Sequence, residues 1–295
     1  MKFAAIDVGS NAVRLLIQES VETEDNGPYF RKISLTRVPI RLGEDVFSDG
    51  VIGDKKARQL VKAMKAFRLL MEVNEVEVFR AVATSAMREA DNGDEVNDQI
   101  LNQAKFRLEI ISGKEEAQLI FDNFHTAKLD AKQTYLYVDV GGGSTEVTLI
   151  KKNKRQKSES FKLGSVRLLN DKVKEEHWQD MKAWVKKLVK GEDDVIIIAT
   201  GGNINRIYKE SKASFGEMME LSELKKILEK IESFSIEDRI RKLKLKPDRA
   251  DVIVPAGKIY RAVAKAAGAK ELMVPKVGLS DGIVYNLYLQ SFENE

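Results

Sequence analysis

The chain has 295 residues, of which 43% are hydrophobic and 32% are charged, and its formal net charge is +3 at pH 7. It has no cysteine and only two histidines, which excludes thiolate catalysis and cysteine-built zinc sites, so any metal should be a hard cation bound by oxygen. The near-balanced charge gives no reason to expect nucleic acid binding. The start of the chain lacks a long apolar run and carries an early acid, Asp7, which predicts a cytoplasmic protein without a membrane partner.

The first 126 residues alternate between strand-like and helix-like apolar periodicity. They open with two strands joined by a tight turn and a third strand of the same meander, which predicts an antiparallel sheet. A long amphipathic helix follows, with Asp54 as its expected cap. The predicted elements of this half are strands at 2–10, 12–20, 29–38, 75–84 and 108–113, and helices at 54–73 and 114–128.

The second half repeats this alternation. A strand, turn and strand over 135–150 is followed by a polar segment, 153–160, which is interpreted as a solvated hairpin connection. The remaining predicted elements are helices at 175–190 and 222–232 and a buried strand at 193–202. No Ser/Gly-rich linker is present, so we expect two closely joined lobes, 1–126 and 127–295, with the final helix a candidate to pack back on the first lobe.

Two segments share one pattern, FAAIDVGSNAVRLLI near the start and YLYVDVGGGSTEVTLI in the middle. Each has a buried strand, Asp-Val-Gly, small polar residues and a returning apolar strand, so the lobes are predicted to be pseudo-repeats. A single Asp-x-Gly is a weak signal, because the aspartate can simply stabilise its own turn. Two copies in equivalent positions favour a functional role.

Glycine lets the backbone approach a ligand closely, so the two turns are candidates to direct N–H groups at phosphate oxygens. A third turn, in IIIATGGNINRI, places glycines at a helix start, where free N–H groups favour an anion. If these turns face one another, they would hold a phosphate chain, and the aspartates at the strand ends would need a hard cation such as Mg²⁺ to approach it. The phosphate-binding candidates are Gly9, Ser10, Asn11, Gly141, Gly142, Gly143, Ser144, Thr145, Gly201 and Gly202, and the metal-binding candidates are Asp7 and Asp139.

Together these segments resemble the exopolyphosphatase and guanosine pentaphosphate phosphatase (Ppx/GppA) family of the actin-like ATPase superfamily. The resemblance rests on segments in family order that cover nearly the whole length, among them ATSAMREA, SGKEEA, GGGSTE, KLGSVRL and GLSDGIVYNL. It implies an α/β fold of two related ribonuclease-H-like lobes with a central interdomain cleft. It also implies hydrolysis of the terminal phosphoanhydride of inorganic polyphosphate or guanosine pentaphosphate (pppGpp), with Mg²⁺ or alternatively Mn²⁺. A homodimer is expected only from the general frequency of dimers.

The resemblance also assigns roles to individual residues. Glu116, the second glutamate of SGKEEA, matches the catalytic base that orients and deprotonates water. Arg88 matches the arginine that reaches the phosphate chain, for which a guanidinium fork is suited. Asp139 matches a metal ligand and Glu146 the metal and water shell. From the residues alone, the first-turn acids Glu115 and Glu116 are equally explained as favourable helix-start residues.

Two further alternatives remain for these side chains. Arg88 could form a surface salt bridge with Glu89 or Asp91, and Glu146 could be a solvent-facing residue of a returning strand. Basic clusters at 151–155 and 241–249 could guide a polyanion, although solvated surfaces explain them as well.

The sequence departs from the family pattern at Gln118, Asn203 and Asp281. Many members also continue into a further helical domain, so this sequence corresponds to a short two-domain form. Two other functions therefore stay open. One is a catalytically weak protein that binds guanosine tetra- or pentaphosphate for regulation, and the other is an ATP-dependent kinase or ATPase of the same superfamily.

Overall fold

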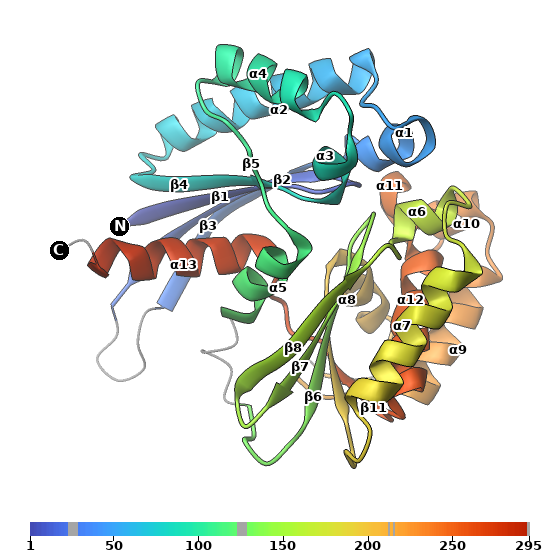
Figure 1. Ribbon diagram of the computed structural model, residues 1–295. Helices are drawn as coiled ribbons and strands as arrows, with labels where there is room; N and C mark the ends of the chain where they lie inside the picture. Colours follow the sequence, from blue (N-terminus) through green and yellow to red (C-terminus); the bar gives the residue numbers. More distant parts are fainter. Residues whose placement is uncertain (23–28, 123–128, 212, 215, 294–295) are drawn as a thin grey trace. The chain divides into compact units, whose positions relative to one another are not determined.

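The computed structural model describes residues 1–295 except 23–28, 123–128, 212, 215 and 294–295 (Figure 1). The predicted lobe boundary near residue 126 and the end of the predicted helix 114–128 lie outside the described residues. Contacts divide the chain into two compact units. Unit 1 comprises Met1–Thr126 and Gly278–Glu295, and unit 2 comprises Ala127–Val277. None of the described helices combines the length and the hydropathy that a membrane span requires.

Unit 1 is built on a five-stranded sheet with the order β3-β2-β1-β4-β5. The first three strands form the predicted antiparallel meander, and β4 and β5 lie parallel to β1. The carboxyl ends of β1, β4 and β5 therefore meet at one edge of the sheet. The strands are β1 (Lys2–Val8), β2 (Val13–Val21), β3 (Tyr29–Val38), β4 (Val78–Ala83) and β5 (Glu109–Ile110).

Helices cover both faces of this sheet. Figure 1 shows α2 and α4 together on one face and α13 with α5 on the other. The predicted long helix is confirmed, but its N-cap is Gly53, and Asp54 is its first residue instead of the cap. The helices of unit 1 are α1 (Leu42–Asp49), α2 (Asp54–Val73), α3 (Ser85–Glu89), α4 (Gly93–Ala104), α5 (Gly113–Asp122) and α13 (Leu279–Glu293).

Unit 2 has a six-stranded sheet with the order β10-β11-β9-β6-β7-β8. Its meander is β6-β7-β8, and β9 and β11 lie parallel to β6. The strands are β6 (Tyr135–Val140), β7 (Thr145–Lys151), β8 (Lys154–Phe161), β9 (Ile196–Thr200), β10 (Met219–Glu220) and β11 (Glu271–Met273).

The predicted solvated connection at 153–160 is wrong, because β8 occupies almost all of it. The turn is instead confined to Lys152 and Asn153, both of which have positive φ. β8 is the edge strand of the sheet and most of its side chains are exposed or half-buried, so a strand can form there without the apolar alternation that normally predicts one.

The helices of unit 2 pack mainly around α12, which contacts α6, α7, α8, α9 and β6. A Cβ on Gly257 of α12 would lie 2.1 Å from the Leu228 side chain, so glycine is required for the close approach of α12 and α9. The helices are α6 (Ser165–Leu169), α7 (Glu175–Leu188), α8 (Gly202–Tyr208), α9 (Leu221–Glu232), α10 (Ile236–Arg241), α11 (Pro247–Ala250) and α12 (Ile253–Ala267).

Asp281 lies in the first turn of α13 and its carboxylate accepts a hydrogen bond of 2.9 Å from the amide of Gly278. Burial raises its pKa above the usual value, and the nearby cations Lys32 and Arg14 oppose this only in part. The folded pKa is thus higher than the unfolded one. An ionised Asp281 therefore lowers stability at neutral pH, and this cost vanishes below the unfolded pKa of about 3.9.

We expect Asp281→Asn to raise the midpoint of thermal unfolding at pH 7, because it removes the buried charge while keeping an acceptor for Gly278. The gain should shrink as the pH is lowered towards about 4, where the wild-type carboxyl is taking up its proton. Thermal unfolding followed by circular dichroism across this range measures the difference. Asp54→Asn, which changes an exposed first-turn acid of α2, is the control. A gain that does not vary with pH would contradict the argument.

Candidate active site

The two sheets place equivalent residues at the ends of their first strands. In unit 1 Asp7 pairs with Arg14 across the hairpin, and in unit 2 Asp139 pairs with Glu146. The turns also close alike. The amide of Gly9 donates to the carbonyl of Ala12 at 3.2 Å, and that of Gly141 donates to the carbonyl of Ser144 at 2.9 Å. This correspondence agrees with the pseudo-repeat predicted from the sequence.

The turn of unit 1 is held from two sides. The amide of Arg41 donates to the carbonyl of Asn11 at 3.0 Å and the amide of Gly43 donates to that of Ser10 at 2.8 Å. The hydroxyls of Ser10 and Ser85 are 2.9 Å apart, which joins the turn to α3. Because both carbonyls are occupied by the start of α1, the conformation of the turn is fixed.

Asp7 is 3% exposed, and its Oδ2 accepts from Nη1 of Arg14 at 2.7 Å. A carboxylate that is already paired with a guanidinium attracts a cation less strongly than one without such a partner. The role of Asp7 in metal binding remains a prediction, and its arginine partner makes it the weaker of the two predicted aspartates.

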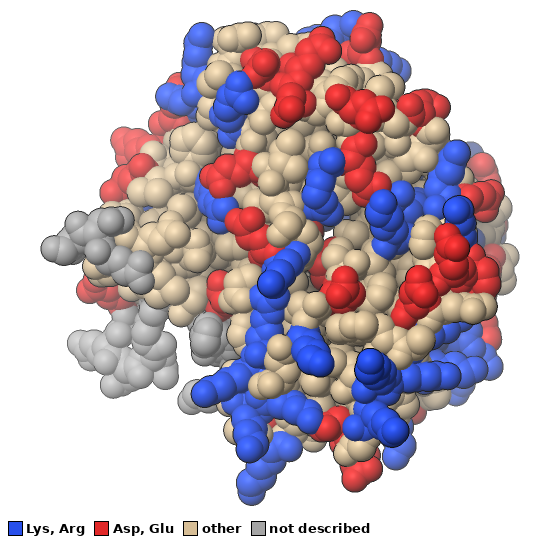
Figure 2. All heavy atoms as spheres, viewed as in Figure 1, with Lys and Arg blue, Asp and Glu red and all other residues tan. Residues whose placement is uncertain are grey.

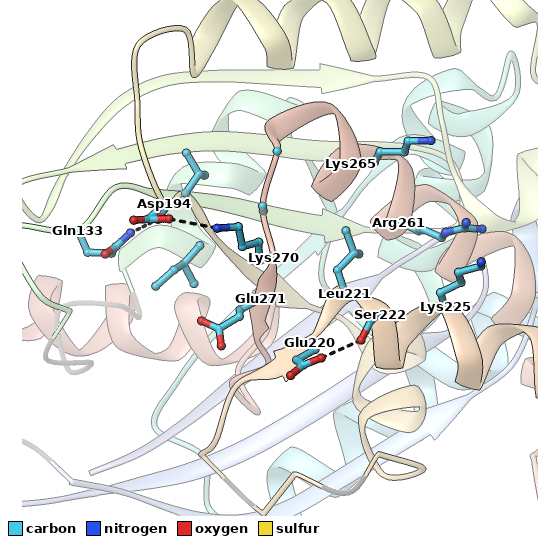
Figure 3. Close-up of a pocket in the computed structure, with 14 residues that line it drawn as sticks. Gln133, Asp194, Glu220, Leu221, Ser222, Lys225, Arg261, Lys265, Lys270 and Glu271 are labelled. Atoms are coloured by element: carbon cyan, nitrogen blue, oxygen red, sulfur yellow. Dashed lines mark hydrogen bonds and ion pairs between the residues drawn. The ribbon is translucent and has the colours of Figure 1, made fainter.

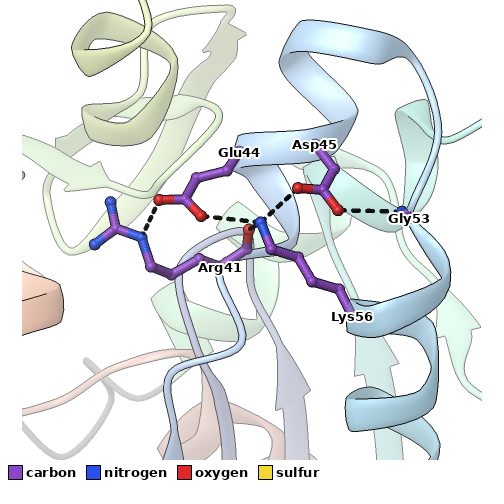
Figure 4. A network of polar contacts seen from close by, with 5 residues as sticks. All are labelled: Arg41, Glu44, Asp45, Gly53 and Lys56. Carbon is purple, nitrogen blue, oxygen red and sulfur yellow. Dashed lines mark hydrogen bonds and ion pairs between the residues drawn. The ribbon is translucent and has the colours of Figure 1, made fainter.

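A cluster of charged residues fixes the segment that holds this turn (Figure 4). Nζ of Lys56 donates to the carbonyl of Arg41 at 2.8 Å, to Glu44 at 2.9 Å and to Asp45 at 2.6 Å. Asp45 also accepts from the amide of Gly53 at 3.1 Å, and Arg41 has a positive φ of 60°. Three acceptors around one ammonium group thus stabilise a backbone conformation that costs energy for a residue other than glycine.

We expect Lys56→Met to lower the free energy of unfolding by about 1–2 kcal/mol, because it leaves the three acceptors without their shared donor. Lys55→Met, at a neighbouring exposed position of α2, should change it by less than about 0.5 kcal/mol. Denaturant unfolding of both variants gives the comparison. Equal effects of the two substitutions would show that the cluster contributes nothing specific.

Arg88 and Glu116 both belong to helices that follow the carboxyl ends of strands in the unit 1 sheet, Arg88 to α3 after β4 and Glu116 to α5 after β5. Arg88 in α3 donates to the carbonyl of Ile111 at 2.6 Å, and the amide of Glu116 donates to the carbonyl of Ser112 at 2.9 Å. Arg88 is half-buried and its side chain donates to the backbone, and within the described part of the chain it forms no salt bridge with Glu89 or Asp91. The arginine therefore fastens α3 to the loop that begins α5.

The two neighbouring glutamates of α5 have different surroundings. Glu115 forms an ion pair with Arg80 at 2.8 Å, and its side chain is 44% exposed. Its amide donates to Oγ of Ser112, so the helix start is capped. Glu116 is only 8% exposed. Of the two, Glu115 has the surface role of a helix-start acid, and Glu116 is the carboxylate enclosed by the protein.

The GGGS turn of unit 2 is held by the start of α6. The amides of Ser165 and Val166 donate to the carbonyls of Gly141 and Gly142, both at 2.9 Å, and Nε of the buried Arg167 donates to the carbonyl of Gly143 at 2.9 Å. A Cβ on Gly164 would lie 2.3 Å from the carbonyl oxygen of Gly142. Only glycine permits this approach of the two backbones.

These contacts occupy the carbonyl side of the turn. Among the residues that the structure describes, no hydrogen bond occupies the amides of Gly142, Gly143 and Ser144. Successive amides without an acceptor, supported beneath by a buried guanidinium, are suited to an anionic oxygen. Phosphate binding by this turn remains a prediction, and the available amides support it.

Glu146 is 1% exposed, so the alternative of a solvent-facing strand residue is wrong. Its Oε1 accepts from the hydroxyls of Ser144 at 2.7 Å and Ser160 at 2.8 Å. Asp139 lies opposite it on β6 and is half-buried. Two carboxylates on adjacent strands, one of them fixed by serines, form a concentration of negative charge next to the glycine turn.

The third glycine turn ends the neighbouring strand, β9. Gly201 has a φ of 112°, and a Cβ there would lie 2.9 Å from Oδ1 of Asp139 and 3.1 Å from the hydroxyl of Tyr260. Gly202 is the first residue of α8. Gly201 therefore lies next to Asp139, because the parallel strands β6 and β9 end at the same edge of the sheet.

Tyr260 of α12 joins the two strand ends. Its hydroxyl accepts from the amide of Val140 at 3.1 Å and donates to the carbonyl of Thr200. Burial, and then the charge of Asp139, raise its pKa well above the usual value, so the hydroxyl keeps its proton and can donate. Tyr260 is a positioning residue that the sequence did not suggest.

We expect Tyr260→Phe to speed hydrogen exchange of the Val140 amide by about tenfold or more, because that donor then has no acceptor. Tyr208→Phe removes a hydroxyl that donates to the carbonyls of Ser214 and Glu217 elsewhere in unit 2, and should leave Val140 unchanged. Exchange measured by NMR or mass spectrometry distinguishes them. Unchanged protection of Val140 in Tyr260→Phe would contradict the positioning role.

A divalent cation is the group that the acids of unit 2 could hold. No group of three or more histidine and carboxylate ligands was found among the described residues. Mg²⁺ does not require one, because it usually keeps several waters and binds through one or two carboxylates and substrate phosphates. Asp139 and Glu146, which lie opposite each other on β6 and β7, fit that pattern.

The predicted basic cluster at 151–155 lies at the tip of the β7–β8 hairpin. Figure 2 shows lysine and arginine side chains gathered over this hairpin and the adjoining end of α7. The tip is at the opposite end of the seven-residue strand β7 from the GGGS turn, which is roughly 20 Å away at the usual rise of a strand. The cluster is therefore separate from the turn itself.

Comparison with known proteins identifies the family of this chain. A model of the Ppx/GppA phosphatase family matches residues 19–291. The chain belongs to this family. Its relatives include the bifunctional 3-dehydroquinate synthase/phosphatase of Fusobacterium nucleatum subsp. nucleatum, with 29% identity over 92% of this chain and 44% of that protein. Another is exopolyphosphatase 1 of Mycobacterium leprae, with 23% identity over 96% of this chain and 88% of that protein.

Solved structures of Ppx/GppA proteins have the same fold. An exopolyphosphatase from Cytophaga hutchinsonii superposes with a TM-score of 0.84 at 21% identity, covering 98% of each chain. The Aquifex aeolicus family member superposes with a TM-score of 0.75 at 23% identity, covering 99% of this chain and 98% of that one. The predicted α/β fold of two related actin-like lobes is confirmed. The chain spans less than half the length of the Fusobacterium relative.

Proposed function

We propose that this Ppx/GppA protein hydrolyses the terminal phosphoanhydride of inorganic polyphosphate or pppGpp and releases orthophosphate. The observation that carries the proposal is the enclosed carboxylate of Glu116, at the start of a helix whose preceding loop is held by Arg88, in a chain that also has a glycine turn with amides available to a phosphate. Water attacks anionic phosphorus poorly, so a base and groups that neutralise phosphoryl charge are both required. The names of the mycobacterial relatives favour polyphosphate as the first substrate to test.

In the proposed reaction, Glu116 orients a water molecule and accepts its proton as the water oxygen attacks the terminal phosphorus. The bond from that phosphorus to the bridging oxygen breaks, and the bridging oxygen leaves with the electron pair on the shortened chain. Arg88 is suited to contact phosphoryl oxygens through its guanidinium. The amides of the GGGS turn are also suited to a phosphate oxygen. Mg²⁺ held by Asp139 and Glu146 would neutralise phosphate charge when bound.

Burial distinguishes Glu116 from its neighbour as the base. Glu116 is only 8% exposed, so its carboxylate is enclosed by the protein. Glu115 has an exposed side chain and is paired with Arg80. The adjacent pair therefore provides a matched test within one helical turn.

We expect Glu116→Gln to lower phosphate release from polyphosphate by about a hundredfold or more with Mg²⁺ present, while Glu115→Gln changes it by less than about threefold. Release from long and short polyphosphate, pppGpp and ATP is measured for both variants and the wild type. Full activity of Glu116→Gln would remove it from this role. Tight binding of pppGpp without release from any anhydride would favour the regulatory function, and turnover of ATP alone would favour the kinase or ATPase.

A further inference from the structure

Unit 2 contains a cavity of about 770 Å³ that is separate from the glycine turns. It is lined by residues at the amino ends of the parallel strands, such as Ile196 at the start of β9 and Glu271 at the start of β11. The glycine turns follow the carboxyl ends of β6 and β9. Along the five residues of β9, the two ends are about 13 Å apart. The cavity has the size of a small-molecule site.

One side of the cavity is basic. Figure 3 shows Lys225 of α9 and Arg261 and Lys265 of α12 on the same side. Arg261 and Lys265 are one helical turn apart, and neither side chain forms a hydrogen bond or ion pair with another residue that the structure describes. Arg261 is half-buried. A partly enclosed guanidinium without an acceptor, next to an ammonium group, is suited to a phosphate.

The other side of the cavity is acidic. Asp194 and Glu271 lie there in Figure 3, and Lys270 is 3.9 Å from Asp194. Leu221 lies between the two sides in Figure 3, and the buried Val195 and Ala269 also belong to the lining. Because carboxylates repel a ligand that is anionic along its whole length, the cavity does not suit a polyphosphate chain. It suits a ligand with a phosphate at one end, a flat apolar middle and N–H groups at the other.

We propose that this cavity binds a nucleotide whose base carries an amino group. Its phosphate is held by Arg261 and Lys265, its ring lies along Leu221, and its base donates to Glu271 or Asp194. This site is distinct from the proposed hydrolytic site and does not depend on it. A nucleoside monophosphate has no phosphoanhydride, so it can be used as a probe that the proposed reaction does not consume.

Calorimetric titration with guanosine 5′-monophosphate (GMP) tests the proposal. We expect binding that Arg261→Gln weakens by about tenfold or more, because a charge-assisted contact is lost. Lys226→Gln, an exposed change on α9 outside the cavity lining, is the matched control and should have no effect. Glu116→Gln should also leave GMP binding unchanged, which separates this result from the fate of the hydrolase proposal.

A second comparison tests the acidic side. Glu271→Gln should weaken binding of GMP and leave binding of ribose 5-phosphate unchanged, since the latter has a phosphate but no base. Absence of GMP binding at millimolar concentration would overturn the proposal, and so would binding that is insensitive to Arg261→Gln. Tripolyphosphate that competes at this cavity more strongly than GMP would overturn the assignment to a nucleotide.

Discussion

The register of one β-hairpin in each unit governs the candidate active site. Pairing of the first and second strands places residue 7 opposite 14 and residue 139 opposite 146. Cross-strand neighbours lie close enough for their side chains to interact directly. Arg14 therefore neutralises the aspartate of unit 1, whereas Glu146 adds a second negative charge in unit 2. A shift by one residue would turn these side chains to the other face, so the register decides which unit can attract a cation.

The packing of each hairpin turn also explains a glycine that lies outside it, Gly43 in unit 1 and Gly164 in unit 2. In each unit the third strand leads to a short helix, through RLG at Arg41–Gly43 and KLG at Lys162–Gly164. In unit 1 the amides of Arg41 and Gly43, within this segment, donate to the carbonyls of the hairpin turn. In unit 2 the amides of Ser165 and Val166, directly after the segment, do so. The carbonyl and N–H groups of the turn point to opposite sides. Because these hydrogen bonds fix the carbonyls, they also fix the N–H groups on the other side. Binding capacity at the turn thus depends on residues some 20–30 positions further along the chain.

Sequence patterns predicted the parts of this protein that repeat or follow a simple period. The meander, the long helix at 54–73 and the paired Asp-x-Gly turns are of this kind. Strand β8 was missed because an edge strand need not alternate. Tyr260 was missed because a buried tyrosine on an apolar helix face resembles an ordinary core residue, and only its hydrogen bonds to two strand ends reveal its role. The repeated RLG and KLG segments were a signal in the sequence that would have identified Gly43 and Gly164.

Helix α12 connects the two ends of the unit 2 sheet. Tyr260 and Arg261 are consecutive, so their side chains point about 100° apart around the helix axis. One is buried with its hydroxyl at the carboxyl ends of β6 and β9, and the other lines the cavity at the amino ends. A ligand at Arg261 can influence the glycine turns only if its affinity differs between two positions of this helix. At Gly257, α12 and α9 pack without room for a methyl group, so the two helices cannot move closer together there.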